Sequence, residues 1–364
     1  MIIQEVINHL ETLSPLSYAE DFDNVGTLVG DVTAPLTGVL VTLDTLESVV
    51  DEAIAKNCNL IVSFHPIIFK GLKKLTGKTY VERVVIKAIK HSIVIYSMHT
   101  ALDNTFEGVS AIICNKLELQ HKQILIPQHG TIKKLTTYVP KDEAKTLRNA
   151  LFSSGAGSIG NYSNCSFSVE GNGTFKGNTV SNPTKGTKDT IHTEAETKIT
   201  VTFPKHLQSK ILKTLLETHS YEEVAYEIIT IENKNQHIGM GMVGELQNSL
   251  SEIDFLNHLK LKMNTGCIRH SSLLHKPIKK IAVLGGSGSF AIGAAKAAGA
   301  DAFVTADLKY HDFFSAENSI FLADIGHYES EQFTKNYLVE YLTKKITNFA
   351  IILSKTNTNP VKYF

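Results

Sequence analysis

The sequence has few cysteines and no excess of either charge. Its four cysteines, Cys58, Cys114, Cys165 and Cys267, lie far apart and form no CxxC pair. This usage argues against a dense disulfide framework and is typical of a reducing compartment. The 36 Lys and Arg residues equal the 36 Asp and Glu residues in number, so no overall field attracts a nucleic-acid backbone or an anionic membrane. We expect no nucleic-acid partner.

Long apolar runs are also lacking. None approaches the roughly 20 residues that a transmembrane helix needs. The first segment, Met1 to Leu13, has apolar residues at helical spacing and acidic residues where a signal peptide has basic ones. It predicts an amphipathic helix rather than a targeting sequence. We therefore expect a cytoplasmic protein without a membrane partner.

What the sequence does contain is an alternation of apolar strands and helices, in two places. The first lies before residue 118, with strands predicted at 39–43, 60–64 and 93–97 and helices at 46–56, 80–91 and 106–117. The second begins after Lys279, with strands predicted at 281–284, 302–305, 320–323 and 349–353 and helices that include one starting at His327. Such alternation predicts parallel strands with helical crossovers. The fold class is therefore α/β, with two halves at 1–125 and 236–364.

The segment between these halves, residues 126–235, follows another order. Strands are predicted at 134–139, 165–169, 196–203 and 224–231, and helices at 141–153 and 207–218. This βαββαβ order is that of a ferredoxin-like unit. The polar stretch from Gly171 to Thr190 is long for a compact domain and is predicted to be either functional or mobile. We predict that residues 126–235 form an inserted domain.

Three predicted strands are each followed by residues of types that commonly serve as metal ligands. The segments are Phe64-His65-Pro66, His99 to Asp103, and Gly326 to Glu331. The loops after parallel strands share one edge of a sheet, so we predict that four side chains converge as metal ligands. Glu331 follows His327 by four residues and shares its face of a helix. These four are His65, Asp103, His327 and Glu331.

Each of these segments also has an ordinary explanation. His65 fits a packed or capping histidine, Asp103 fits a helix cap, and the pair formed by His327 and Glu331 fits a helix surface. The coincidence of their positions favours the metal hypothesis. Imidazole and carboxylate ligands without thiolate suit Zn, Mn, Fe or Ni.

A second group of residues is predicted to have auxiliary or substrate-binding roles near this site. Gly285 to Ser289 connect a strand to a helix and form either an anion cradle or a tight turn. Asp307 and His311 follow the next strand and are expected to line the same cleft. With His99, the auxiliary candidates are Gly285, Gly286, Ser287, Asp307 and His311.

The sequence resembles the dinuclear-metal-centre family, also called the GTP cyclohydrolase I type 2 homologues. The resemblance lies in the segments at 19–26, 65–69, 99–103, 305–311 and 326–331. It implies a core of the dinuclear-metal-centre type that binds divalent ions through His65, Asp103, His327 and Glu331, with Glu331 bridging two ions. It also implies a homohexamer, and a hydrolase that uses metal-activated water on a nucleotide such as GTP or on another small molecule.

The inserted segment resembles the PII/CutA-like module of longer family members, through residues 154–157, 159–162 and 219–226. The chain departs from the family pattern at Phe64, where a first of two adjacent histidines is usual. Phenylalanine has no lone pair, so one or two ions per subunit remain possible. The alternative function is a non-catalytic metal-binding or regulatory protein whose PII-like insertion senses a small ligand. Scaffolding through the hexamer is a third.

Overall fold

The computed structural model describes residues 1–364 and separates into two compact units. The first unit comprises Met1–Pro127 and Gln236–Phe364, and the second comprises Gln128–Asn235. Each unit has a hydrophobic core of its own. No helix combines the length and the apolar character that crossing a bilayer requires. The first unit is therefore built from two stretches of sequence that the second unit separates.

One sheet of the first unit comes mainly from the N-terminal stretch. Its strand order is β1-β4-β3-β2-β15, with β1 antiparallel to β4 and the other neighbours parallel. Every residue of β2, β3 and β4 is buried, as expected for parallel strands that are covered on both faces. The predictions of β2, β3, β4 and β15 are confirmed. The bounds are β1 Gly26–Val29, β2 Val39–Thr42, β3 Leu60–Ser63, β4 Val94–Ser97 and β15 Ile351–Leu353.

The second sheet of this unit has the order β11-β14-β13-β12-β10-β5. Its three central strands, β12, β13 and β14, are parallel, as predicted. The strands β5, β10 and β11 were not predicted. β10 contains Gly239, where an added Cβ would lie 2.2 Å from the carbonyl oxygen of Ile126. The bounds are β5 Gln120–Gln128, β10 Asn235–Leu250, β11 Arg269–His270, β12 Ile278–Ser287, β13 Ala302–Ala306 and β14 Phe321–Asp324.

Helices cover these two sheets. The predicted amphipathic first helix is confirmed as α1, which buries Ile3, Val6, Ile7 and Leu10. The helix predicted at 106–117 begins later, at Val109, because the chain turns so tightly at Gly108 that an added Cβ would meet the Leu102 carbonyl. The helices are α1 Ile3–Leu13, α2 Glu47–Ala55, α3 Tyr80–Lys90, α4 His99–Asp103, α5 Val109–Lys116, α8 Glu252–Met263, α9 Ile292–Ala297, α10 His327–Glu331 and α11 Thr334–Lys345, with short 3-10 turns η1 Leu16–Tyr18, η3 Ser289–Ala291 and η4 Tyr310–Ala316.

The two halves of the first unit share one core. Val62 on β3, Val304 on β13 and Leu338 on α11 belong to the same buried apolar cluster, although they come from opposite ends of the sequence. Burial of apolar side chains stabilises a fold by about 1.5–3 kcal/mol for each large residue. The shared cluster therefore holds the two sheets together around the site described below.

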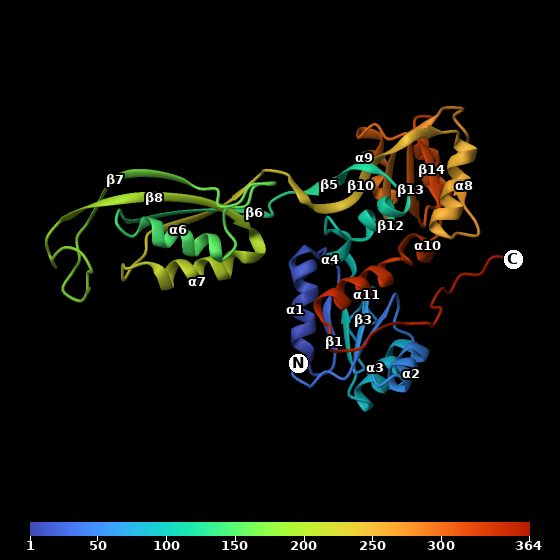
Figure 1. The fold of residues 1–364 in the computed structure, drawn as a ribbon, viewed down its shortest axis with the longest axis horizontal. Coiled ribbons are helices and arrows are strands. Elements are labelled where there is room, and N and C mark those ends of the chain that lie inside the picture. Colours follow the sequence, from blue (N-terminus) through green and yellow to red (C-terminus); the bar gives the residue numbers. More distant parts are fainter. The chain divides into compact units, whose positions relative to one another are not determined.

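The second unit contains four antiparallel strands in the order β7-β8-β6-β9. Figure 1 shows α6 and α7 side by side on one face of this sheet. Leu147 and Leu151 of α6 pack with Ile211 and Leu215 of α7 in the core. The elements follow the predicted βαββαβ order, with the bounds β6 Ile132–Pro140, α6 Ala144–Ser153, β7 Phe167–Phe175, β8 His192–Pro204, η2 Lys205–Leu207, α7 Gln208–Thr218 and β9 Tyr226–Ile231.

The C-terminal segment after β15 is tied to α2 through Glu52. The Glu52 carboxylate accepts hydrogen bonds from the Lys355 amide, at 2.9 Å, and from the hydroxyls of Ser354 and Thr356, at 2.6 and 2.8 Å. Burial by itself raises the pKa of Glu52, but these bonds and Lys56 outweigh it and lower the pKa to about 2. The ionised carboxylate therefore anchors this segment.

Replacing Glu52 with glutamine is expected to flatten the acid dependence of stability. A lowered pKa in the folded state contributes stability above the unfolded value of about 4.5, and this contribution is lost as pH falls toward 2. Thermal unfolding between about pH 5 and pH 3 should show a steeper fall of Tm for the wild type than for Glu52→Gln. Glu217→Gln, an exposed change on α7, is the control. Equal slopes for Glu52→Gln and the wild type would contradict the assignment.

Candidate metal centre

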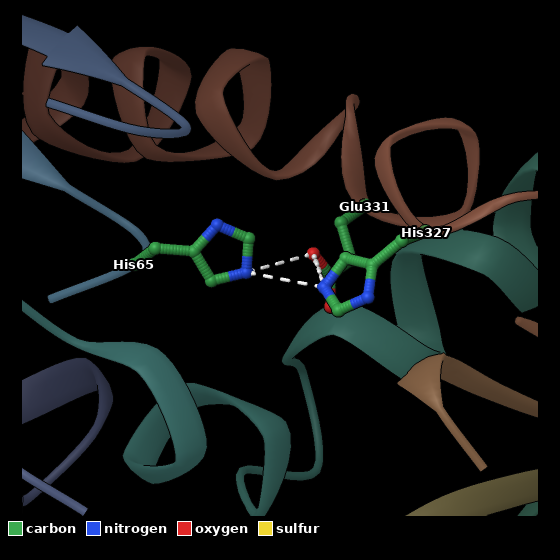
Figure 2. A group of neighbouring side chains, drawn as sticks. All are labelled: His65, His327 and Glu331. Atoms are coloured by element: carbon green, nitrogen blue, oxygen red, sulfur yellow. Dashed lines mark hydrogen bonds and ion pairs between the residues drawn. The ribbon is translucent and has the colours of Figure 1, made fainter. Parts of the chain in front are cut away.

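In the first unit, the carboxyl ends of the parallel strands of the two sheets face each other. His65 follows β3 in one sheet, and His327 follows β14 in the other and opens α10. Their Nε2 atoms lie 3.4 Å apart. Figure 2 shows both rings pointing toward the same position. Two histidines that are 262 positions apart in the sequence are thus brought together.

Glu331 completes this cluster. It lies one helical turn after His327 on α10, and its Oε2 atom is 3.1 Å from His65 Nε2 and 3.3 Å from His327 Nε2. The ligand atoms of the three residues all lie within 4.8 Å of one another. The triad of His65, His327 and Glu331 is therefore a group that could hold a metal ion, and it contains three of the four predicted ligands.

The chemistry of these residues fits a cation. The Glu331 side chain is only 3% exposed, and its Oε2 atom accepts no hydrogen bond of acceptable geometry. A buried carboxylate without a cation or a donor is costly. Two ring nitrogens and one carboxylate oxygen form the donor set of many three-ligand zinc sites. The orphaned oxygen and the two nitrogens would all be satisfied by one divalent ion.

The pKa shifts within the cluster also favour a positive charge at this position. Burial by itself lowers the pKa of His65, but the carboxylates of Glu331 and Asp44 outweigh it and raise the pKa to about 10. Burial also lowers the pKa of His327, but the carboxylates of Asp307 and Glu331 outweigh this effect and raise the pKa to about 11. The two imidazoles in turn lower the pKa of Glu331 against the effect of its burial. Positive charge is therefore strongly favoured beside Glu331.

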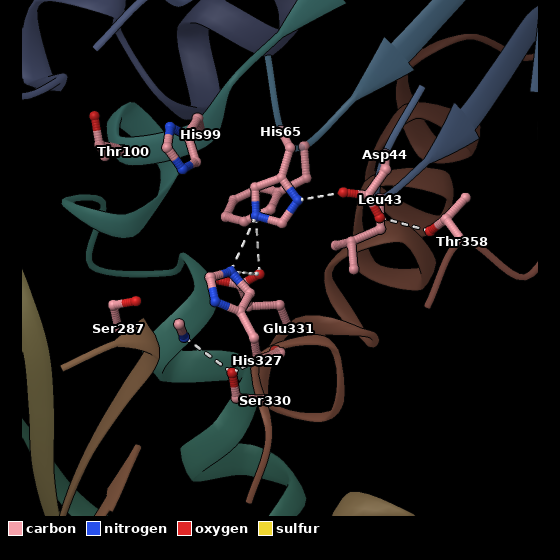
Figure 3. Close-up of polar contacts among 12 residues, drawn as sticks. Leu43, Asp44, His65, His99, Thr100, Ser287, His327, Ser330, Glu331 and Thr358 are labelled. Carbon is pink, nitrogen blue, oxygen red and sulfur yellow. Dashed lines mark hydrogen bonds and ion pairs between the residues drawn. The ribbon is translucent and has the colours of Figure 1, made fainter. Parts of the chain in front are cut away.

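Each histidine of the triad is oriented by a carboxylate from the neighbouring strand. Asp44, after β2, contacts His65 Nδ1 at 2.8 Å, and Asp307, after β13, contacts His327 Nδ1 at 2.7 Å. The Ser287 hydroxyl donates to Asp307 at 2.5 Å. Such contacts fix the orientation of a ring and leave Nε2 facing the site. Figure 3 shows the Asp44 contact, which continues to Thr358.

Glycines make room for Glu331. Gly286 has a φ of +67°, and a Cβ there would lie 2.6 Å from Glu331 Oε1. Gly326, with a φ of +93°, provides the sharp entry into α10. The Gly286 amide donates to Ser330 Oγ at 2.9 Å, so this amide is already engaged. The segment at 285–287 is part of β12, which runs along the carboxylate.

A cavity of about 280 Å³ adjoins the triad. Among the predicted residues, it is lined by Asp103, by the auxiliary candidates His99, Gly285, Gly286 and Ser287, and by His327 and Glu331. Phe22, Met240 and Phe290 supply apolar walls. Asp103 is outside the triad, and burial together with the nearby Glu331 charge raises its pKa well above the usual range.

The other auxiliary candidates have different surroundings. His99 has a φ of +23°, and its Nδ1 atom contacts Asp23 at 2.8 Å. Its ring centre is 5.3 Å from that of His65, at the cavity wall. His311 lies on η4, where its ring contacts Tyr310 and Phe314 and does not line the cavity.

Phe64 is fully buried in the shared core. Its ring centre lies 4.9 Å from that of His65 and 5.7 Å from that of His99. The position thus carries a packed aromatic ring that offers no ligand atom. The apolar packing also restricts where the neighbouring His65 ring can go.

Sequence reasoning missed two carboxylates of this site. Asp44 directly follows a strand predicted at 39–43, so the rule that selected His65 would have found it. Asp23 binds both the His99 ring and the Thr100 hydroxyl, at 2.8 and 2.5 Å. It lies in a loop before β1, which carries no periodic signal. Asp44 contacts His65 of the triad, whereas Asp23 contacts His99 at the cavity wall.

The fold and the site define an α/β protein in which two mixed sheets hold a His–His–Glu cluster, and comparisons identify its family. The model of the family described as Duf34/NIF3 (NGG1p interacting factor 3) matches residues 1–360. The GTP cyclohydrolase 1 type 2 homolog of Bacillus subtilis is 37% identical to this chain, covering 99% of it and 98% of the relative. The Staphylococcus aureus protein of the same name is 35% identical over the full length of both chains.

A solved structure agrees with these relatives. The crystal structure of a Bacillus cereus protein related to NIF3 is 34% identical and matches with a TM-score of 0.88, covering 100% of this chain and 99% of that one. The chain belongs to the Duf34/NIF3 family, which includes the GTP cyclohydrolase 1 type 2 homologues. The family resemblance predicted from the sequence is confirmed.

Proposed function

We propose that this protein binds one divalent metal ion through His65, His327 and Glu331 and uses it to hydrolyse a small molecule in the adjacent cavity. The observation that carries the proposal is the convergence of two Nε2 atoms on a buried carboxylate oxygen that accepts no hydrogen bond. An ion bound there would supply a Lewis acid and a water molecule of lowered pKa. Zn, Mn, Fe and Ni all suit these ligands.

The protein's own residues would prepare the site in a defined way. Asp44 and Asp307 hold the Nδ1 side of each imidazole, so both Nε2 atoms face the triad position. Gly286 leaves the space that the Glu331 carboxylate occupies. His99 and Asp103 face the cavity and are placed to contact a substrate. Phe22 and Phe290 would pack against its apolar part and limit access of water.

We propose one ion rather than two. Asp103 and Glu331 both line the cavity and would be oxygen ligands for a second ion. Phe64, however, removes the ring nitrogen that the family pattern offers next to His65. His99 lines the cavity but does not belong to the close group of ligand atoms that His65, His327 and Glu331 form. This grouping supports one ion at the triad.

The reaction proposed follows from the relatives' name and the size of the cavity. A volume of about 280 Å³ is near the lower end of the range of ligand pockets, about 300–1,000 Å³. It has room for one ring system rather than a whole nucleoside triphosphate. Hydrolytic opening of a purine ring agrees with both when the base alone enters the cavity and the ribose and phosphates stay outside it. GTP is the first substrate to try.

Two measurements on the purified full-length protein test this proposal. Elemental analysis should find about one divalent ion per subunit, and none would overturn the metal assignment. Metal-dependent turnover of GTP or of a related purine should be lost in His327→Ala and kept in His311→Ala, whose histidine lies outside the cavity. Activity that survives in His327→Ala would refute the hydrolytic role.

We further propose that residues 126–235 are an inserted domain of ferredoxin-like, PII-related type and that the protein forms a homohexamer. The βαββαβ order and the sheet order β7-β8-β6-β9 support the first proposal. Light scattering on the purified protein tests the second, since a mass other than six subunits would contradict it.

A further inference from the structure

The second unit has a large cavity of its own. It has a volume of about 720 Å³ and is lined only by residues of that unit. Its walls come from β7 and β8, from Tyr138 on β6, from the connection between β7 and β8, and from residues 221–225 before β9. The connection, residues 176–191, contains most of the polar stretch from Gly171 to Thr190 that was predicted to be functional or mobile, and the first five residues of that stretch belong to β7.

Hydrogen bonds hold this connection against the cavity. The Asn182 amide donates to Glu222 Oε2 at 2.7 Å, and the Thr184 hydroxyl donates to the Ser220 carbonyl at 2.7 Å. At its base, the Asp189 amide donates to the Gly177 carbonyl at 2.7 Å. The connection is thus closed at its base and fastened to the segment before β9, so it forms a wall of the cavity.

One buried carboxylate faces this cavity without a cation. Glu196 on β8 is only 9% exposed, and its Oε1 atom accepts a hydrogen bond from the Tyr221 hydroxyl at 2.8 Å. No Lys, Arg or His nitrogen lies within 4.0 Å of it. A Cβ at Gly173 would lie 2.1 Å from Glu196 Oε2, so the glycine leaves space for the carboxylate. Burial of such a group is costly unless something pairs with it.

A lysine without a partner lines the same cavity. Lys185 is half-buried, and its side chain makes neither an ion pair nor a hydrogen bond. Glu170, by contrast, is paired with Lys141 at 2.8 Å, and Glu222 accepts the Asn182 amide. Glu196 and Lys185 do not pair with each other. Glu223, Lys176 and Lys198 also line the cavity, but they are exposed. Glu196 and Lys185 are the charged groups of the lining that are withdrawn from solvent and have no charged partner.

The rest of the lining is suited to an apolar body. The rings of Phe175 and Tyr221 lie 5.8 Å apart, and Tyr138, Val169 and Pro183 add further apolar surface. Burial and the neighbouring Glu196 raise the pKa of Tyr221, so its hydroxyl stays a donor. Aromatic faces also attract a nearby ammonium group.

We propose that this cavity binds an α-amino acid with an aromatic or large aliphatic side chain. Its ammonium group pairs with Glu196, its carboxylate pairs with Lys185, and its side chain lies against Phe175 and Tyr221. A zwitterion is the small molecule that supplies both missing charges at once. The site is separate from the metal centre, so it stands whether or not that centre is hydrolytic.

Calorimetry on the full-length protein tests the charge requirement with matched ligands. L-Phenylalanine, L-tyrosine, L-leucine and L-methionine form the first panel, and at least one should bind with a Kd below about 1 mM. The second panel contains phenethylamine, which lacks the carboxylate, and 3-phenylpropionate, which lacks the ammonium group. Both should bind at least 10-fold more weakly than L-phenylalanine, the amino acid from which they differ by one charged group. Absence of amino-acid binding, or equal binding of either analogue, would overturn the proposal.

Variants then locate the site. Glu196→Gln and Lys185→Met should each weaken amino-acid binding at least 10-fold, while Glu217→Gln, on the exposed surface of α7, should leave it unchanged. Circular dichroism should be the same for all three, because Glu196→Gln keeps the size of the buried side chain and the other two changes lie outside the hydrophobic core. Undiminished binding in both Glu196→Gln and Lys185→Met would place the amino acid elsewhere and refute the assignment.

Discussion

Replacing Glu331 with alanine is expected to weaken metal binding at least 100-fold, so that the purified protein no longer carries an ion. Glu331 supplies the only oxygen among the three converging ligand atoms, and its side chain is almost wholly buried. Loss of a group that merely orients a ligand costs about 10–100-fold in metal affinity. Loss of a direct ligand should cost at least as much. Elemental analysis after purification without added metal measures the result.

Asp103→Asn is the matched comparison for this experiment. It also changes a buried carboxyl group beside the same cavity, but one outside the triad. Wild-type metal content in Asp103→Asn, together with a metal-free Glu331→Ala, would support a single ion at the triad. Equal loss in both variants would mean that Asp103 is a ligand and that the one-ion proposal is wrong. Wild-type content in Glu331→Ala would refute the site.

Replacing Phe64 with alanine is expected to lower the free energy of unfolding of the first unit by about 3–5 kcal/mol. The Phe64 side chain is fully buried in the core that both halves share. Its removal leaves a cavity next to His65 that the surrounding strands can only partly fill. Urea unfolding monitored by circular dichroism measures the change.

Phe290→Ala is the control, because this ring is 60% exposed at the cavity wall. It should change the unfolding free energy by less than about 1 kcal/mol. Phe64→Leu should keep most of the stability and all of the metal, since the phenyl ring contributes no ligand atom. A Phe64→Ala protein as stable as the wild type would show that the packing at this position is unimportant.

Site residues could be predicted where a side chain that can bind a metal follows an apolar strand. His65 and His327 follow apolar runs that are long enough to be recognised as buried strands, and the spacing from His327 to Glu331 is one helical turn. Asp44 satisfies the same rule and was missed only because a single aspartate after a strand is unremarkable by itself. Asp103, predicted as a metal ligand, and His99, predicted as an auxiliary residue, both line the cavity outside the triad. The distinction between a wall residue and a member of the triad depends on tertiary geometry.

Parts of the fold could not be predicted for physical reasons. β10 contains Gly239, Gly241 and Gly244, and glycine weakens any strand signal. These glycines lack side chains, so β10 can approach β5 and β12 closely and pair with them. The pairing depends on residues that are distant in the sequence. The contact from Thr358 to Asp44 comes from a segment without regular structure. No periodic pattern marks such a segment in advance.

The 262 positions between His65 and His327 give the triad a consequence for the unfolded chain. An ion held by both histidines would act as a cross-link that closes a very long loop, with the whole second unit inside it. Closing a loop removes entropy from the unfolded state, and each doubling of its length adds about 0.6 kcal/mol. The same link ties β14, which lies between β11 and β13 in one sheet, to β3, the middle strand of the other. The ion would therefore add to the shared apolar core in holding the two halves together.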